Sequence, residues 1–447
     1  MHISSSAFKI SNRRASGMYR RLLVCGISAL GMTIPMPALT VPPLLSPVGA
    51  EVAGNAAGTI PAWTGGMRTP PSGWRSTQGY IDPFASEQPL LTVTGANMQE
   101  YRDRLTPGVQ AVLSRTPEFR MPIYPTHRTA GYPEKSKPRQ AVTSADSQAK
   151  TGSVPFPEPR NGLEAISNHL LRDLGGGVER KFDSFVVRRN GDFTKIGFHD
   201  KRIYDENFDK SLPNRLFSYI GDFLSPADLV GTIYLVHEPN PLSAEERKAW
   251  IYNAGQRRVR RAPDLAYDNV QNGSDGLAIV DQYDGYNGSP NLYEWQLLGK
   301  REMLVPYNNY RISDKRVPYS DVIRKGAPNS ELLRFELHRV WVVEAKLKSG
   351  QSHVYPRRLF YLDEDSWSVL LSEAYDSRGK MWRVGLHSLV QYYDALVPWY
   401  RFELWFDLSN DSYVLTGLDN EYKTPWTFGV SGLIQDFQPE ALRRMGH

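Results

Sequence analysis

Residues 367–386, with the sequence WSVLLSEAYDSRGKMWRVGL, show the pattern that decides the fold. Two largely apolar runs flank Ser377-Arg378-Gly379, a short group of turn-forming residues. Four further turn signals separate comparable runs, at Asn190-Gly191, Gly255-Gln256, Ser349-Gly350-Gln351 and Asn410-Asp411. Turns at short intervals between such runs are typical of an antiparallel meander. We therefore expect a mainly β protein with a few helices, α+β in class, built on one large antiparallel sheet.

The first third of the chain lacks this pattern. Residues 39–160 are expected to form an N-terminal extension with a Pro/Gly-rich arm, short helices over 98–105 and 107–119, and a mobile polar loop over 133–153. Asn161 is placed to cap a helix over 162–174, since an Asn side chain can accept from the first free backbone amides. Residues 161–447 are then expected to form the antiparallel domain, which a short helix over 439–445 ends.

The N-terminus has the pattern of an export signal. Arg20-Arg21 precede a short apolar run over 22–30, and a stretch of small residues ends at Met36-Pro37-Ala38. This predicts a secretory signal peptide over 1–38 that is cleaved on export, with either Met1 or Met18 as the start. The exact cleavage site stays open.

The whole of the net charge lies in that predicted signal. The chain has 53 basic and 48 acidic residues, a formal charge of +5. Residues 1–40 contain five basic residues and no acidic residue, so 53 − 5 = 48 basic residues face 48 acidic residues in the remainder. The single cysteine, Cys25, also lies there. The exported part is therefore expected to be neutral and free of cysteine, without affinity for nucleic acid.

Motifs for catalysis and metal binding are missing. The sequence contains no Gly-x-Ser-x-Gly, no His-Glu-x-x-His and no phosphate-binding Gly-x-x-x-x-Gly-Lys-Ser/Thr. Asp281 and Asp284 allow a carboxylate pair or a calcium loop on one side and a solvated loop on the other, and the spacing favours the solvated loop. We expect no catalytic residue, no metal site and no cofactor.

Two strand segments, 333–343 and 401–408, carry apolar residues on both faces. Few helices are available to cover a sheet of this size, so an uncovered face would form either a hydrophobic cavity or a core sealed by a second sheet. Because side-chain parity cannot be fixed from the sequence, we expect about half of any list of lining residues to face outward. The candidates for lining the cavity are large aromatic residues: Tyr234, Trp250, Tyr252, Phe335, Trp341, Phe360, Trp382, Phe402 and Trp405.

Basic residues cluster once, at Arg257-Arg258-Val259-Arg260-Arg261. The cluster suits either of two roles equally. It can bind anionic head groups or phosphates, or it can protect a sheet edge from pairing with another chain.

Several longer motifs carry a family resemblance. They are Ser46–Glu51 with Ala53–Gly66, Met121–Thr129, Pro155-Phe156-Pro157 with Asn161–Ala165, Val305–Arg311 and Tyr361–Trp367. From about residue 44 to the C-terminus the chain resembles the bacterial envelope family called domain of unknown function 1329. Residues 133–153 are shorter and more polar than the family pattern.

That family is similar to periplasmic lipoprotein carriers of the LolA/LolB type. The resemblance implies an incomplete antiparallel β-barrel, with helices that plug or cover a hydrophobic cavity for acyl chains. It also implies a periplasmic location with contact to the outer membrane or to the membrane periphery, association with outer-membrane proteins or with exporters of the resistance-nodulation-division type, and no established catalytic residue.

Three functions remain open from the sequence. The first is a carrier for a lipid or another hydrophobic molecule in transport between membranes. The second is an adaptor or assembly component of an export system that holds no cargo. The third is an envelope hydrolase, which would need two carboxylates, or a Ser/His pair, to converge in a cleft. The cargo, its direction of transfer and the oligomeric state are not encoded in any motif.

Overall fold

The computed structural model describes residues 44–134, 154–262 and 267–446. The predicted signal peptide and nearly all of the predicted polar loop lie outside these residues. Residues 43–447 form one compact unit, so the predicted extension and the predicted sheet domain share it.

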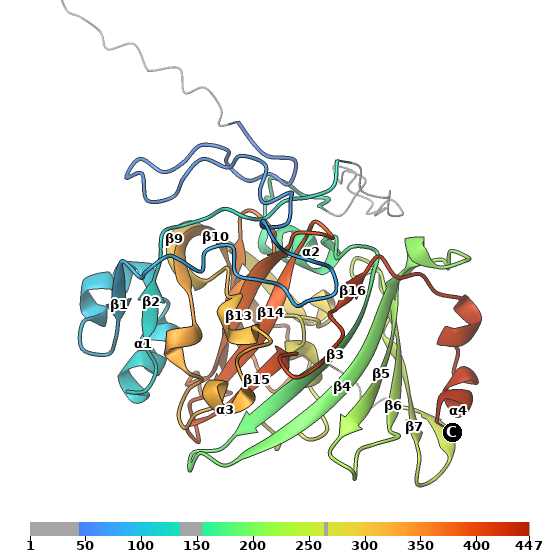
Figure 1. Ribbon diagram of the computed structural model, residues 1–447. Coiled ribbons are helices and arrows are strands. Elements are labelled where there is room, and N and C mark those ends of the chain that lie inside the picture. Colours follow the sequence, from blue (N-terminus) through green and yellow to red (C-terminus); the bar gives the residue numbers. More distant parts are fainter. Residues whose placement is uncertain (1–43, 135–153, 263–266, 447) are drawn as a thin grey trace, which may run out of the picture. The chain divides into compact units, whose positions relative to one another are not determined.

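A single curled sheet dominates the unit (Figure 1). Its strand order is β1-β2-β10-β11-β12-β13-β14-β15-β3-β4-β5-β6-β7-β8, with β9 paired to β10 and β16 paired to β3. Neighbours are antiparallel, except for the short parallel contact between β2 and β10. The two ends of the sheet do not pair with each other among the described residues, so the barrel is incomplete as expected. The strands are β1 (Leu91–Val93), β2 (Met121–Ile123), β3 (Gly177–Val187), β4 (Phe193–Tyr204), β5 (Arg215–Ser225), β6 (Ile233–Pro239), β7 (Lys248–Asn253), β8 (Arg258–Arg261), β9 (Tyr293–Pro306), β10 (Phe335–Leu347), β11 (Arg357–Asp363), β12 (Val369–Tyr375), β13 (Met381–Tyr392), β14 (Val397–Asp407), β15 (Ser412–Leu418) and β16 (Thr427–Phe428).

The helices are short. Asn161 caps α2 as expected, because its side-chain oxygen accepts from the amide of Glu164 at 2.9 Å. The α-helices are α1 (Pro107–Arg115), α2 (Gly162–Leu171), α3 (Tyr319–Val322) and α4 (Ala441–Met445). The 3-10 helices are η1 (Met98–Arg104), η2 (Asp205–Asn207), η4 (Val280–Gln282), η5 (Pro290–Leu292), η6 (Arg311–Ser313), η7 (Ser330–Leu332) and η8 (Ile434–Phe437).

The sequence pattern did not reveal β9, the longest strand of the sheet. Residues 262–332 are polar and rich in Gly and Asn, which is not typical of a strand, yet β9 within them pairs with the whole of β10. The charged run Lys300-Arg301-Glu302 lies on a largely exposed part of β9, so the strand has no simple apolar alternation. A register shift opposite Val342 also breaks the period of 2.

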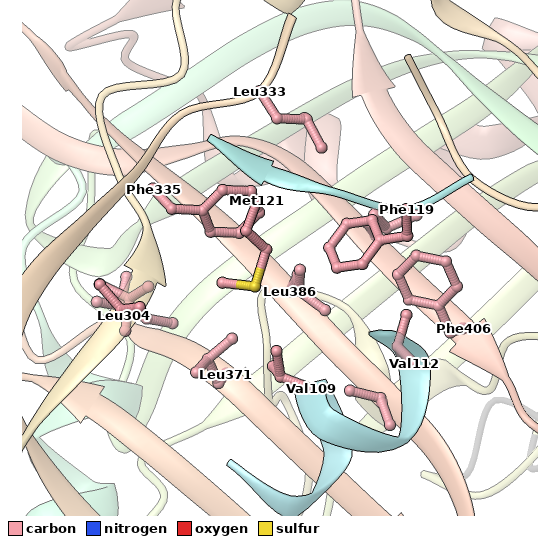
Figure 2. Packing of buried hydrophobic residues seen from close by; sticks show 14 of the residues in the cluster. Val109, Val112, Phe119, Met121, Leu304, Leu333, Phe335, Leu371, Leu386 and Phe406 are labelled. Carbon is pink, nitrogen blue, oxygen red and sulfur yellow. The ribbon is translucent and has the colours of Figure 1, made fainter. Parts of the chain in front are cut away.

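The outer face of the sheet carries the main hydrophobic core. A row of cross-strand partners crosses five strands there, namely Leu371, Leu386, Leu404, Leu415 and Phe185. Helix α1 and strand β2 cover this row, and Figure 2 shows Val109, Val112 and Met121 packed against Leu371, Leu386 and Phe406. The N-terminal extension is therefore part of the core.

The opposite face, called the inner face here, is covered in part. Helix α2 lies against β9 and β10, where Ala165 and Ile166 pack with Phe360 and Val369. Residues 271–287, called the covering segment below, also cross the inner face, and Tyr286 joins the same cluster. Over β3 to β6 the cover is incomplete, and a cavity remains.

Candidate functional site

A cavity lies between the inner face and the covering segment. Its volume is about 150 Å³, and an engineered apolar cavity of about that size in another protein admits benzene. The sheet supplies a wall of mostly apolar side chains: Phe182, Val186, Ile196, Phe198, Phe217, Tyr219, Phe223, Tyr234, Val236, Trp405 and Val414. The covering segment supplies the opposite wall, with Gln271, Asn272, Ser274, Ala278, Val280, Gln282, Tyr283 and Asn287.

The strand register gives the cavity two different ends. At one end Val186 pairs with Val414, and these two residues cluster with Ile196 and Leu277. In the middle Phe198 pairs with both Phe182 and Phe223.

At the other end Arg202 pairs with Tyr219, which pairs in turn with Val236. Arg247 and Asn287 also line the cavity. The cavity thus runs from an apolar end to an end that contains guanidinium and amide groups.

Buried ion pairs fix the covering segment at the polar end. Asp284 accepts from Arg172 at 2.6 Å, from Arg202 at 3.2 Å and from the indole of Trp399 at 2.6 Å. Burial alone would raise the pKa of Asp284, but the two guanidinium groups outweigh burial and lower the pKa to about 2. The carboxylate is therefore ionised and holds the segment against β4 and β14.

Asp281 provides a second attachment. Its carboxylate accepts from Arg358 at 2.5 Å, and His353 lies 3.1 Å away. The interpretation of Asp281 and Asp284 as a solvated loop was therefore wrong, since 0% of Asp281 and 7% of Asp284 is exposed. Sequence spacing could not show this, because the partner arginines are 77 and 112 residues away.

The nine predicted lining residues lie in different parts of the structure. Tyr234 and Trp405 line the cavity. Trp250 and Tyr252 lie on the outer face in a cluster with Phe437 and Leu442.

The other five lie in the hydrophobic clusters or pack against them. Phe335 and Phe402 belong to the outer-face core, whereas Trp341 and Phe360 lie in the cluster beneath α2. Trp382 packs against Tyr355, in a cluster that also contains Ile279 of the covering segment.

Four phenylalanines of the cavity wall were missed, namely Phe182, Phe198, Phe217 and Phe223. The alternation in the hairpin around Asn190-Gly191 places Phe182 and Phe198 on one face, so the sequence held a signal for these two. Strand β5, which carries Phe217 and Phe223, was not recognised as a strand.

A Ser–His–Glu arrangement lies beside the cavity. The hydroxyl of Ser372 is 2.9 Å from Nε2 of His387, and Nδ1 of His387 is 2.9 Å from the carboxylate of Glu403. Gly385 makes room for the pair, because a Cβ there would lie 2.6 Å from Nε2 of His387. Glu403 lines the cavity, but Ser372 is only 2% exposed and is not one of the lining residues.

A second buried cluster has the composition of a metal site. Ligand atoms of His338, Asp363 and Asp365 lie within 4.8 Å of one another. Both oxygens of Asp365 are taken by the guanidinium of Arg128, at 2.6 and 2.9 Å. A cation would have to compete with that guanidinium, so the residues fit an ion-pair network better than a metal site.

The arginine cluster lies at the end of the sheet. β8 pairs only with β7 among the described strands, and Arg257, Arg258, Arg260 and Arg261 are exposed. Both predicted roles, head-group binding and edge protection, remain predictions.

No described helix has the length and apolar character that crossing a membrane requires. Among solved structures, a DUF1329 family protein from Desulfovibrio piger is 16% identical and aligns with 63% of this chain and 97% of its own, at a TM-score of 0.45. A LolA superfamily protein from Nitrosomonas europaea is 10% identical over 63% of this chain and 100% of its own, at a TM-score of 0.39.

Comparison of sequences finds similarity over a larger part of the chain. The uncharacterized protein PA3922 of Pseudomonas aeruginosa is 42% identical over 417 residues, which are 90% of this chain and 91% of that protein. The model of the protein family of unknown function DUF1329 matches residues 92–443. The chain therefore belongs to the DUF1329 family.

Proposed function

We propose that this protein binds a hydrophobic molecule in the cavity over β3 to β6 and carries it through the bacterial envelope. The cavity is the observation that supports the proposal. Its wall on the sheet side is made mostly of phenylalanine, valine and isoleucine side chains, and the covering segment faces this wall without filling the space between them. Burial of apolar ligand surface there would contribute about 25 cal/mol per Å².

The proposed location is the periplasm, in agreement with the export signal predicted over 1–38. A carrier of this kind would exchange its ligand with a membrane or with an envelope protein. An adaptor role without cargo is the alternative that the same experiment tests, because an adaptor has no need of the cavity.

The test is ligand binding by a protein whose cavity is filled. Val236 lines the cavity and Val259 lies on the edge strand β8 outside it. We expect a fluorescent fatty acid to bind the native protein and to bind Val236→Trp at least about tenfold more weakly. Val259→Trp, the matched control, should retain native affinity, and thermal unfolding should show both variants to be folded. Failure of the native protein to bind any hydrophobic probe would overturn the carrier proposal and favour the adaptor role.

The Ser372–His387–Glu403 arrangement supports a second candidate, an esterase acting on a lipid in the cavity. Hydroxyl, imidazole and carboxylate in this order are the components of a nucleophilic triad. The burial of Ser372 counts against it, since a substrate could reach the hydroxyl only after the chain around it had moved. Hydrolysis of short-chain p-nitrophenyl esters that Ser372→Ala abolishes would favour this candidate; equal background rates in both proteins would reject it.

A further inference from the structure

The arginine cluster at the end of the sheet lacks acidic partners among the described residues. All four of its arginines are exposed, and none forms an ion pair with a described Asp or Glu: Arg257, Arg258, Arg260 and Arg261. Exposed arginines elsewhere commonly form such pairs, as Arg120 does with Glu331 at 2.8 Å. The chain after residue 40 has equal numbers of basic and acidic residues, so the excess of positive charge at this edge is local.

The cluster presents charge on both faces of the sheet. Val259 pairs with Tyr252, a buried residue of the outer face, so the side chain of Val259 also lies on that face. Side chains alternate along a strand, which puts Arg261 on the outer face with Val259 and puts Arg258 and Arg260 on the inner face. Two of the guanidinium groups therefore belong to the face that carries the cavity.

Arg260 continues a row that begins in the cavity wall. It pairs with Ile251 on β7, and Ile251 pairs with Tyr234 on β6, which lines the cavity. Neighbouring strands are about 4.8 Å apart, so the backbone of Arg260 lies about 10 Å from that of Tyr234. The basic edge is thus close to the cavity and on the same face of the sheet.

An exposed apolar side chain lies near the cluster. The turn between β5 and β6 touches the turn between β7 and β8, because a Cβ on Gly231 would lie 2.7 Å from the Cβ of Ala254. Val230, which precedes Gly231, is 50% exposed. Asp228 is the one acidic residue between β5 and β6, and it forms no ion pair with a described residue. Buried apolar side chains and the attraction of basic residues to anionic lipids together bind proteins at the surface of a bilayer.

The same arginines disfavour a protein strand as the partner of this edge. β8 pairs only with β7 among the described strands, but charged side chains on an edge strand hinder the pairing of a further strand. A bilayer requires no backbone pairing. It also presents many negative head groups in one plane, which suits an edge that has guanidinium groups on both of its faces.

We propose that β8 and the two adjoining turns dock this protein on a membrane surface that contains anionic lipids. The arginines bind the head groups, Val230 enters the interface, and the inner face with its cavity is held close to the bilayer. This inference rests on the proposed function, and it names the partner with which the carrier exchanges its ligand.

Flotation of vesicles tests the docking. We expect the native protein to bind vesicles of phosphatidylcholine with about 30% phosphatidylglycerol at least about tenfold more tightly than vesicles of phosphatidylcholine alone. Binding should weaken as the salt concentration rises, because salt screens exposed charges. Equal binding to both kinds of vesicle, or binding to neither, would overturn the proposal.

Reversal of charge separates docking from edge protection. The double substitution Arg258→Glu and Arg260→Glu keeps two charges on the edge, which still hinder strand pairing, but changes their sign. We expect this variant to keep the native oligomeric state in size-exclusion chromatography and to bind anionic vesicles at least about tenfold more weakly. The control, Arg104→Glu and Arg301→Glu, makes the same change in charge at exposed positions on η1 and β9 and should bind them much more tightly than the reversed variant.

The outcomes are distinct. If the reversed variant is folded by thermal unfolding and binds anionic vesicles as well as the control does, the arginines protect the edge only and the proposal is wrong. Binding of an oligoglutamate peptide without binding of vesicles would also overturn it, in favour of an acidic protein partner. Val236→Trp, whose cavity is filled, should bind vesicles as the native protein does. Native protein that binds anionic vesicles but no hydrophobic probe would support docking and reject the carrier proposal.

Discussion

The indole nitrogen of Trp399 on β14 donates a hydrogen bond of 2.6 Å to Asp284 in the covering segment. Together with Arg172 and Arg202, this bond holds the segment to the inner face from two sides. The boundary of the cavity is therefore set by buried charge as well as by apolar packing.

Replacement of Asp284 by Asn should destabilise the protein. The substitution keeps the shape of the side chain but leaves Arg202 buried without its carboxylate. Breaking a buried ion pair by removing one partner costs about 3–5 kcal/mol, and urea unfolding at pH 7 measures the loss. Glu100→Gln removes an exposed carboxylate and should change stability by less than about 0.5 kcal/mol. Equal stabilities of the two variants would contradict the assigned role.

The contribution of Asp284 should depend on pH in a defined direction. Its pKa in the folded protein is about 2, below the value of about 3.9 expected for an unfolded chain. The stability it provides is therefore complete above about pH 4 and is lost as the pH falls toward about 2. The difference in unfolding free energy between native protein and Asp284→Asn should shrink over that interval; a constant difference would argue against an ionised carboxylate.

The contribution of Asp363 to the stability of the protein should depend on pH in the opposite direction. Burial and the charge of Asp365 raise its pKa to about 7. A group whose pKa rises on folding favours the folded state at low pH, and that contribution is lost as the pH rises from about 4 through about 7.

Asp363→Asn cannot ionise, so its stability relative to the native protein should increase by about 2–4 kcal/mol between pH 4 and pH 8, at about 1.4 kcal/mol per pKa unit. Urea unfolding across this range measures the change. Asp321→Asn, at an exposed position, should follow the native curve.

The N-terminal extension should unfold together with the sheet. Leu113 on α1 is 2% exposed and belongs to the outer-face core, whereas Leu163 on α2 is 40% exposed. Leu113→Ala should lower the free energy of unfolding by about 2–5 kcal/mol, and Leu163→Ala should lower it by much less. A single shifted transition in far-ultraviolet circular dichroism is expected for Leu113→Ala. A separate early transition would instead mark the extension as an independent unit.

Much of the architecture could be predicted because the turns of β-hairpins have characteristic residues that are adjacent in the sequence. The turn at Asn190-Gly191 and the cap at Asn161 depend on residues close in sequence, and both lie where the pattern placed them. The motifs that carry the family resemblance could also be recognised in the sequence, but the contacts between those motifs could not. Arg128 of one motif bonds Asp365 of another, 237 residues away.

The lining of the cavity was harder to predict for a physical reason. Register shifts occur between Ser388 and Leu389, between Ala374 and Tyr375, and at other points of the sheet. Each shift moves the side chains that follow to the opposite face, so parity counted from one end of a strand does not hold at the other end. The choice between faces is then made by distant packing, as for Phe402 in the outer-face core.

The attachment of the covering segment at Asp281 and Asp284 has a consequence for cargo selection. Part of the inner face is occupied by the protein's own chain, which these two carboxylates hold in place. Under the carrier function proposed above, a bound molecule would extend from the apolar cluster around Leu277 to the fixed carboxylate of Asp284. The two anchored aspartates would then limit the length of the molecule that the cavity holds, independently of how strongly its walls attract hydrocarbon.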